Sequence, residues 1–120
     1  MDLQISERKS QNVTILDLRG RVVIGRTNDS FAAELRKLAE SALCNVLINL
    51  TDVAQVDSSG LSTLVRSFVT LERDGGSLKL LNPSGHVKEI LELTRLVQCF
   101  PTYTNEAEAL ASFRDSAAHA

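Results

Sequence analysis

Aromatic residues, cysteines and histidines are all scarce in this sequence of 120 residues. Only 4% of the residues are aromatic and none is tryptophan. The core must therefore be aliphatic, and a base-stacking surface for single-stranded nucleic acid is not expected. The cysteines, Cys44 and Cys99, and the histidines, His86 and His119, are too few and too scattered for a protein-built zinc site. We interpret both cysteines as buried, reduced thiols of a cytoplasmic protein.

Excess positive charge and long apolar runs are also missing. The formal net charge is −2 and the pI is about 5.6, which argues against nucleic-acid partners and against electrostatic attraction to anionic lipid. No run of about 18 apolar residues occurs, so we expect no membrane span. The N-terminal segment lacks the apolar stretch of a signal peptide. We expect one cytoplasmic domain that builds its own core and holds neither a metal nor a cofactor.

Strand and helix patterns alternate along the chain. Residues 2–7 and 13–18 have strand patterns, and the polar turn at 9–12 predicts that they form an antiparallel hairpin. Further strands are predicted at 22–24, 46–50, 78–81 and around 99–103. The last three are each followed by a helical pattern, so the order predicts an α/β domain with a mixed sheet of four to five strands.

Four helices are expected where apolar residues recur every three or four positions. Their expected caps or first residues are Thr27 or Asn28, Ser58 or Ser59, Ser84, and Asn105. Their expected inward residues include Phe31, Leu35, Leu38, Ala42, Leu64, Val87, Leu91, Ala107, Leu110 and Phe113. The second helix ends at the Gly75-Gly76 pair, and residues 115–120 are expected to fray.

The segment from Thr51 to Gly60 connects the strand at 46–50 to the second helix and holds the main candidate site. In open α/β sheets, functional residues gather beyond the carboxyl ends of parallel strands. We expect buried valines to pin this turn to the core, which leaves Asp57, Ser58 and Ser59 at the first turn of the helix.

A serine in this position can cap the helix, bind an anion or accept a phosphoryl group. The tetrapeptide Asp57–Gly60 alone favours a plain cap. A nucleophilic serine enzyme would need a base within reach. Only His86 could serve, and the segment Ser84-Gly85-His86 is better explained as a helix start.

Longer stretches around this turn resemble the signature of the bacterial anti-sigma factor antagonists, the STAS domain family. The resemblance runs through Val46–Leu61, continues in Gly75–Pro83 and Glu106–Leu110, and covers about residues 3–114 in the family's order. It implies a single STAS domain over 3–114, with helices mainly on one face of the sheet, that is not an enzyme.

Leu93, Leu96 and Val97 either complete the core of a monomer or form an apolar patch for a weak homodimer.

In this family, the serine directly after the aspartate is phosphorylated by a partner anti-sigma factor with serine kinase activity, and by position that serine is Ser58. The resemblance implies that the unphosphorylated protein binds the anti-sigma factor and frees the sigma factor. Phosphorylation breaks the complex, and a serine phosphatase restores it. A phosphate adds about −1.5 to −2 charges at pH 7 beside Asp57, which fits release from a packed interface.

The remaining partner-binding candidates surround this serine. The second helix has a polar side, short of charge, that we expect to face solvent and to contact the partner. Gly60 is expected to let a partner backbone approach closely. The predicted partner-binding residues are Asp57, Ser59, Gly60, Thr63, Arg66 and Arg21.

The chain departs from the sporulation-type antagonists of the family after the second strand. Those proteins carry an acidic pair in a Gly-Glu-Leu-Asp pattern, where this chain has Gly20-Arg21-Val22-Val23. Arg21 is either a solvated loop residue or, like Arg26, a contact to an acidic partner or to the phosphate itself. The missing acids leave an alternative open: a STAS interaction subunit of a transport or signalling assembly that is never phosphorylated.

The same segment, Gly20–Thr27, has the spacing of a P-loop with arginine in place of lysine. A phosphate cradle needs residues that tolerate unusual φ values, whereas Val22, Val23 and Ile24 are β-branched. We therefore do not expect a nucleotide-binding enzyme.

Overall fold

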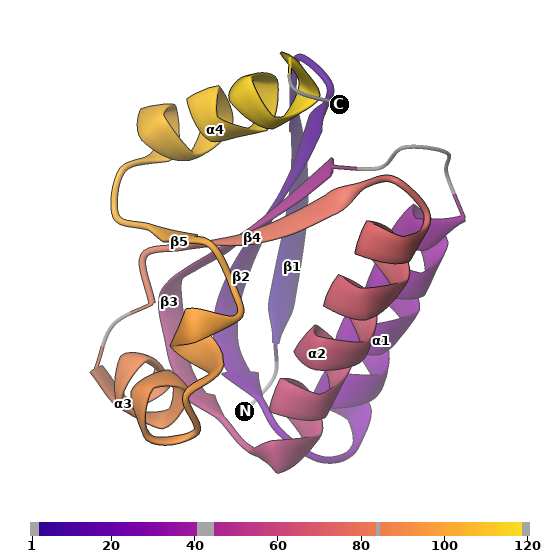
Figure 1. The fold of residues 1–120 in the computed structure, drawn as a ribbon. Coiled ribbons are helices and arrows are strands. Elements are labelled where there is room, and N and C mark those ends of the chain that lie inside the picture. The colour runs from indigo at the N-terminus through magenta and orange to yellow at the C-terminus, as the bar shows by residue number, and fades with distance from the viewer. Residues whose placement is uncertain (1–2, 41–44, 84, 119–120) are drawn as a thin grey trace.

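The computed structural model describes residues 3–40, 45–83 and 85–118. Within them, strands form one mixed sheet in the order β1-β2-β3-β4-β5 (Figure 1). The first two strands are antiparallel, and each later strand is parallel to the one before it. The strands are β1 (Gln4–Ser10), β2 (Val13–Val22), β3 (Asn45–Val56), β4 (Ser77–Leu81) and β5 (Thr102–Tyr103). The predicted mixed sheet is confirmed.

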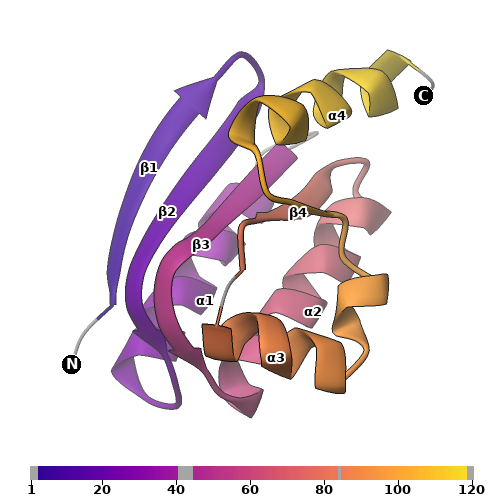
Figure 2. The same ribbon diagram turned by 90° about the vertical axis from the view of Figure 1, so that its left-hand side faces the viewer.

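Three helices cover one face of the sheet and the fourth covers the other face (Figures 1 and 2). The first face carries α1 (Arg26–Ala39), α2 (Ser58–Arg73) and α3 (Gly85–Leu93), and the other carries α4 (Glu106–Ala118). A short 3-10 helix, η1 (Leu96–Gln98), follows α3. The predicted arrangement, with helices mainly on one face, is confirmed.

The central strands contribute to two cores because their side chains alternate between the faces. Leu16 of β2 and Ile48 of β3 point to the α1–α2–α3 face and are fully buried. Their neighbours Ile15 and Leu47 point to the other face and pack with Phe113 of α4. Apolar residues on both faces are typical of parallel strands that are covered on both sides.

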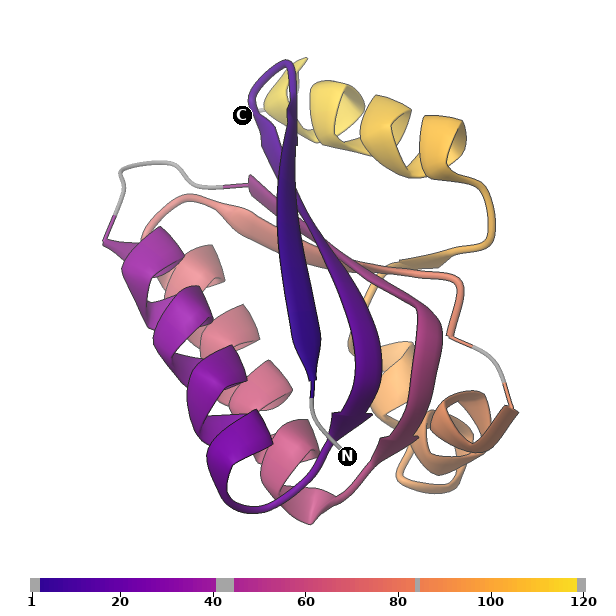
Figure 3. The same cartoon turned by 180° about the vertical axis from the view of Figure 1, so that it is seen from behind.

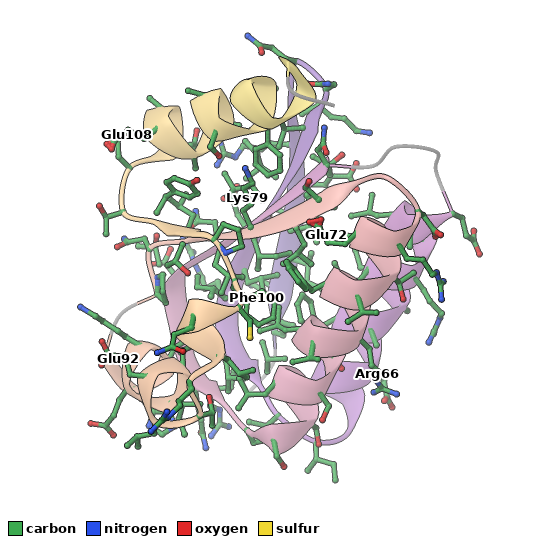
Figure 4. All side chains as sticks on the ribbon, viewed as in Figure 1. Arg66, Glu72, Lys79, Glu92, Phe100 and Glu108 are labelled. Carbon is green, nitrogen blue, oxygen red and sulfur yellow. The ribbon has the colours of Figure 1, made fainter. Side chains whose placement is uncertain are left out.

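Lys79 of β4 lies under α4, with only 6% of its surface exposed (Figure 4). Its Nζ donates to the Ser112 hydroxyl at 2.9 Å and lies 4.6 Å from the centre of the Phe113 ring. The ring of Tyr103 is 5.9 Å away. A cation is therefore held between α4 and the sheet by a hydroxyl and two aromatic rings.

Two strands are longer than predicted, so most of the expected turn and loop sequence is strand. β2 continues through Arg21 to Val22, and β3 continues to Val56. The two strands remain paired to their ends, although β3 carries one residue more than β2 at two places, between Asn49 and Asp52 and between Val53 and Gln55. Val53 and Val56 are buried as predicted, but their spacing of three residues does not show the alternation of a regular strand.

Helix ends also differ from the predictions. α1 begins at Arg26 with Gly25 as its N-cap, not Thr27 or Asn28. Gly25 has a φ of 103°, which glycine adopts without strain. α4 continues to Ala118, so its backbone is helical where we expected the chain to fray.

Two residues expected inside are exposed. Ala107 is exposed in the first turn of α4, where Ala109 and Phe113 provide the buried side instead. Cys99 is exposed because it follows η1 at the surface, and Phe100 takes the neighbouring core position with 3% exposure. The predictions for Ala42, Cys44 and Ser84 fall outside the described residues.

Candidate functional site

Asp57 connects β3 to α2 and is the N-cap of that helix. Its Oδ1 accepts the backbone amides of Ser59 at 3.0 Å and Gly60 at 3.2 Å. Its Oδ2 accepts the amide of Ile24 at 2.8 Å, and its own amide donates to the Val22 carbonyl at 3.2 Å. One residue therefore ties the segment that follows β2 to the first turn of α2.

These hydrogen bonds favour the ionised form of Asp57 and lower the pKa of its carboxyl. Burial of the carboxyl would raise its pKa, but the amides of Ile24, Gly60 and Ser59 together outweigh this effect and hold the pKa below its ordinary value of 3.8. Both carboxylate oxygens are occupied by backbone amides. The geometry therefore suits Asp57 to fixing the turn rather than to accepting protons.

Ser58 is the first residue of α2 and is exposed. The amides of the next two residues already bond to Asp57, so the cap is provided by the aspartate and not by this serine. Ser59 is half-buried. Of the two serines at the start of the helix, Ser58 is thus the more accessible to another protein.

Gly60 is buried against its own sheet. A Cβ at this position would lie 2.8 Å from the carbonyl oxygen of Val22 and 2.8 Å from Cγ1 of Val56. The glycine therefore allows α2 to start directly against the ends of β2 and β3. Our expectation that Gly60 admits a partner backbone was wrong, because its own chain occupies that space.

An open groove of about 640 Å³ begins at Ser58 and follows α2. Leu61 and Val65 of the helix and Leu96 of η1 make its apolar part. Its full lining is Ser58, Leu61, Ser62, Val65, Arg66 and Leu96. An apolar centre with a polar rim is the usual anatomy of a protein-binding surface. We did not predict this lining, because Leu61 and Val65 have the spacing of core residues and η1 has no clear sequence signal.

The polar side of α2 is only partly solvent-facing. Thr63 is 3% exposed, and its hydroxyl donates to the Ser59 carbonyl at 3.1 Å. This residue is buried because α1 lies alongside α2 (Figure 3). Arg66 is exposed at the outer side of the helix pair (Figure 4). Thr63 is therefore withdrawn as a direct partner contact, whereas Arg66 is accessible and borders the groove.

Arg21 lies in β2 opposite Gln55, half-buried, and not in a loop as expected. Its Nε is buried without a hydrogen-bond partner among the described residues, and Arg21 does not line the groove beside Ser58. Of the segment after Gly20, Val22 and Ile24 contact the Asp57 turn. Ile24 is 78% exposed, and we missed it because a run of β-branched residues looks like a buried strand.

The two enzyme interpretations lack the geometry they need. Gly20–Val22 is strand and cannot wrap a phosphate as a P-loop does. His86 is exposed at the start of α3 and does not line the groove.

Among the described residues, no group of three acidic, histidine or cysteine side chains could hold a metal ion. None of the described helices is long and apolar enough to cross a membrane.

Known proteins resemble this chain over nearly its full length. The STAS domain model matches residues 4–109. The anti-sigma F factor antagonist of Paenibacillus polymyxa is 25% identical over 111 residues, covering 92% of this chain and 94% of the relative. The anti-sigma-B factor antagonist of Bacillus subtilis (strain 168) is 28% identical over 96 residues, covering 80% and 86%. The Bacillus cell fate determinant SpoIIAA, solved in its phosphorylated form, has a TM-score of 0.72 at 18% identity, with 91% and 98% covered.

Proposed function

The chain belongs to the STAS domain family, and we propose that it is an anti-sigma factor antagonist whose binding is switched by phosphorylation of Ser58. The names of the two curated relatives support this class. One observation carries the proposal: an exposed serine follows the capping Asp57 and stands at the end of an apolar groove. A modification at that serine acts directly on anything bound in the groove.

The unphosphorylated protein binds an anti-sigma factor through this groove and so frees a sigma factor. Leu61, Val65 and Leu96 supply apolar area, while Arg66 supplies a charge at the rim. The turn is fixed in advance by Asp57, so the chain loses little conformational freedom on binding. The protein works as a binding switch and not as an enzyme.

The anti-sigma factor also acts as the serine kinase. The Ser58 hydroxyl oxygen displaces ADP from the γ-phosphorus of ATP, and its proton passes to a base of the kinase, because both oxygens of Asp57 already bond to amides. Asp57 positions the acceptor serine. Ser59, in the first turn of α2, donates its amide to Asp57. A serine phosphatase later hydrolyses the phosphate and restores the binding form.

Release follows from charge and desolvation. A phosphate brings about −1.5 to −2 charges at pH 7. A helix N-terminus normally stabilises an anion, but here Asp57 already occupies the Ser59 and Gly60 amides. The phosphate therefore stays in solvent at the end of the groove, next to a second anion. Covering it with a partner would cost more than the roughly 2.8 kcal/mol that weakens binding a hundredfold.

The chain is a cytoplasmic monomer or weak homodimer in this proposal. Leu93 at the end of α3 is 74% exposed, and Leu96 lines the groove. These two leucines offer apolar area for a weak contact between copies, and that contact would compete with the partner for the groove.

The test uses the cognate kinase with ATP and locates the phosphate by phosphopeptide mass spectrometry. We expect the phosphate on Ser58, no incorporation in Ser58→Ala, and unchanged incorporation in the control Ser30→Ala, which removes an exposed hydroxyl of α1 that does not line the groove. Phosphate mainly on Ser59 would refute the assignment. An active kinase that binds the chain but leaves Ser58 unmodified would instead favour a STAS subunit that is never phosphorylated.

A further inference from the structure

A second groove, of about 230 Å³, lies between α1 and α2. Leu35 and Thr63 form its floor, and they are 1% and 3% exposed. Arg36 of α1 and Arg66 of α2 stand at its sides, and both are exposed. The groove is therefore a hollow with a buried floor and a cation from each helix.

Neither arginine forms an ion pair with a carboxylate of the described residues. Other cations of the same helices do form ion pairs: Lys37 pairs with Glu34 at 3.9 Å, and Arg73 at the end of α2 pairs with the C-cap residue Asp74 at 3.4 Å. No acidic residue lines the groove. Two guanidinium groups thus face one hollow without a counter-charge, although the chain as a whole carries a net charge of −2.

This arrangement matches the chemistry of anion binding. Two like charges beside one cavity repel each other. An anion placed between them is attracted to both, and this attraction outweighs the repulsion between the two cations. Guanidinium groups bind carboxylate and phosphate through paired N–H donors. Ser67 and Thr70 also line the groove and add hydroxyl donors. The volume is just below the usual range for ligand pockets, so the ligand must be small.

We propose that the α1–α2 groove binds a small organic dianion, either a phosphate monoester or a dicarboxylate, between Arg36 and Arg66. The inference does not depend on phosphorylation of Ser58. It has a consequence for partner binding, because Arg66 borders both grooves. A bound dianion neutralises a charge at the rim of the surface beside Ser58, so it weakens contact with an acidic partner.

The experiment is an NMR titration of the isolated, ¹⁵N-labelled protein at constant ionic strength, with glycerol 3-phosphate in one series and succinate in another. We expect saturable shifts of backbone amides confined to residues 32–39 and 63–70. Arg36→Gln and Arg66→Gln should each weaken binding by about tenfold or more, as loss of a charged hydrogen-bonding partner does. The control Arg73→Gln, on the same helix but outside the groove, should leave the affinity unchanged.

Three outcomes would overturn the proposal. Shifts that never saturate with either probe mean that no site exists for small dianions. Equal losses of affinity in Arg36→Gln and Arg73→Gln mean that the anion responds to general charge. If neither probe binds but Arg36→Gln weakens binding of the anti-sigma factor, the groove accepts acidic side chains of the partner protein instead. Saturable binding by only one probe supports the proposal and identifies the class of dianion.

Discussion

The carboxylate of Asp57 accepts the amide of Ile24 at 2.8 Å, across a sequence separation of 33 residues. The same carboxylate caps α2 through Ser59 and Gly60. The turn that presents Ser58 is therefore held from two sides by one ionised group, and its geometry depends on the segment after β2 as well as on the helix.

Replacing Asp57 with alanine should remove both the cap of α2 and the hydrogen bond to the Ile24 amide. Loss of an N-cap costs about 1 kcal/mol, and loss of a further hydrogen bond to a charged group adds a similar amount. We expect Asp57→Ala to lower the free energy of unfolding by about 2 kcal/mol in urea denaturation. The control Ser58→Ala, at an exposed neighbour, should stay within about 0.5 kcal/mol of wild type. Equal stabilities of the two variants would contradict the described role of the carboxylate.

The contribution of Asp57 should also depend on pH. Its pKa is lowered in the folded state, so its stabilisation is complete above the unfolded-state pKa and is lost as the pH falls through the lower folded-state value. Asp57→Asn lacks this titration. The difference in unfolding free energy between wild type and Asp57→Asn should stay constant from pH 7 to pH 5 and shrink below the ordinary pKa of 3.8. Urea denaturation at a series of pH values measures it, and shrinkage already above pH 5 would mean that the pKa is raised.

Gly60→Ala should destabilise the protein, although alanine is the better helix former. Helix propensity alone would favour alanine by about 1 kcal/mol. The new Cβ would lie 2.8 Å from the Val22 carbonyl oxygen, and that oxygen already accepts the Asp57 amide. We expect a net loss of about 1–3 kcal/mol in the free energy of unfolding. Ser62→Ala, at an exposed position of the same helix, should be neutral or slightly stabilising, and a gain in Gly60→Ala would refute the packing described.

Lys79→Met tests how α4 is held to the sheet. Methionine keeps the apolar stem but removes the cation over Phe113 and the bond to Ser112. We expect a loss of about 1–2 kcal/mol. Hydrogen exchange should accelerate first in α4, with α2 still protected. Lys88→Met, at an exposed position of α3, is the control and should show neither change. Unaltered exchange in α4 would mean that apolar packing alone retains the helix.

The order of the elements could be predicted from the sequence because apolar periodicity is a local property. The hairpin and the helix that starts at Ser58 were both predicted on that basis. The end of β3 was missed because β3 carries an extra residue at two places along its pairing with β2, and these residues interrupt the alternation by which a strand is recognised in a sequence. Thr63 was misplaced for a related reason: its burial depends on α1, which lies more than 20 residues earlier in the chain.

In the candidate site, too, local features could be predicted and long-range contacts could not. Asp57 and Ser58 could be found because a helix cap depends on residues that are adjacent in the sequence. The Ile24 amide, the wall formed by Leu96 and the contact of Gly60 with Val22 could not, because each joins segments that are distant in the sequence. Arg21 was expected beside the serine, but the extension of β2 places it opposite Gln55.

Negative charge at Ser58 should weaken binding in proportion to its size. A carboxylate supplies about one negative charge, fewer than a phosphate and with less bulk. Ser58→Asp should therefore weaken binding of the anti-sigma factor by about tenfold, and phosphorylated wild type by about a hundredfold or more. Ser58→Ala should bind like unphosphorylated wild type and resist release by ATP, because it has no acceptor hydroxyl.

Gln11→Asp is the matched charge control. It adds the same charge in the exposed β1–β2 turn, at the end of the molecule opposite the first turn of α2 (Figure 1). If the effect is local, Gln11→Asp leaves the affinity unchanged in isothermal titration calorimetry, because charges separated by much more than about 8 Å are screened at physiological salt. Equal weakening by Gln11→Asp and Ser58→Asp would show that net charge, not position, controls binding. Equal affinities of wild type, Ser58→Ala and Ser58→Asp in folded protein would show that Ser58 is no part of the interface. The function of the chain would then be better described as that of a STAS interaction subunit that is never phosphorylated.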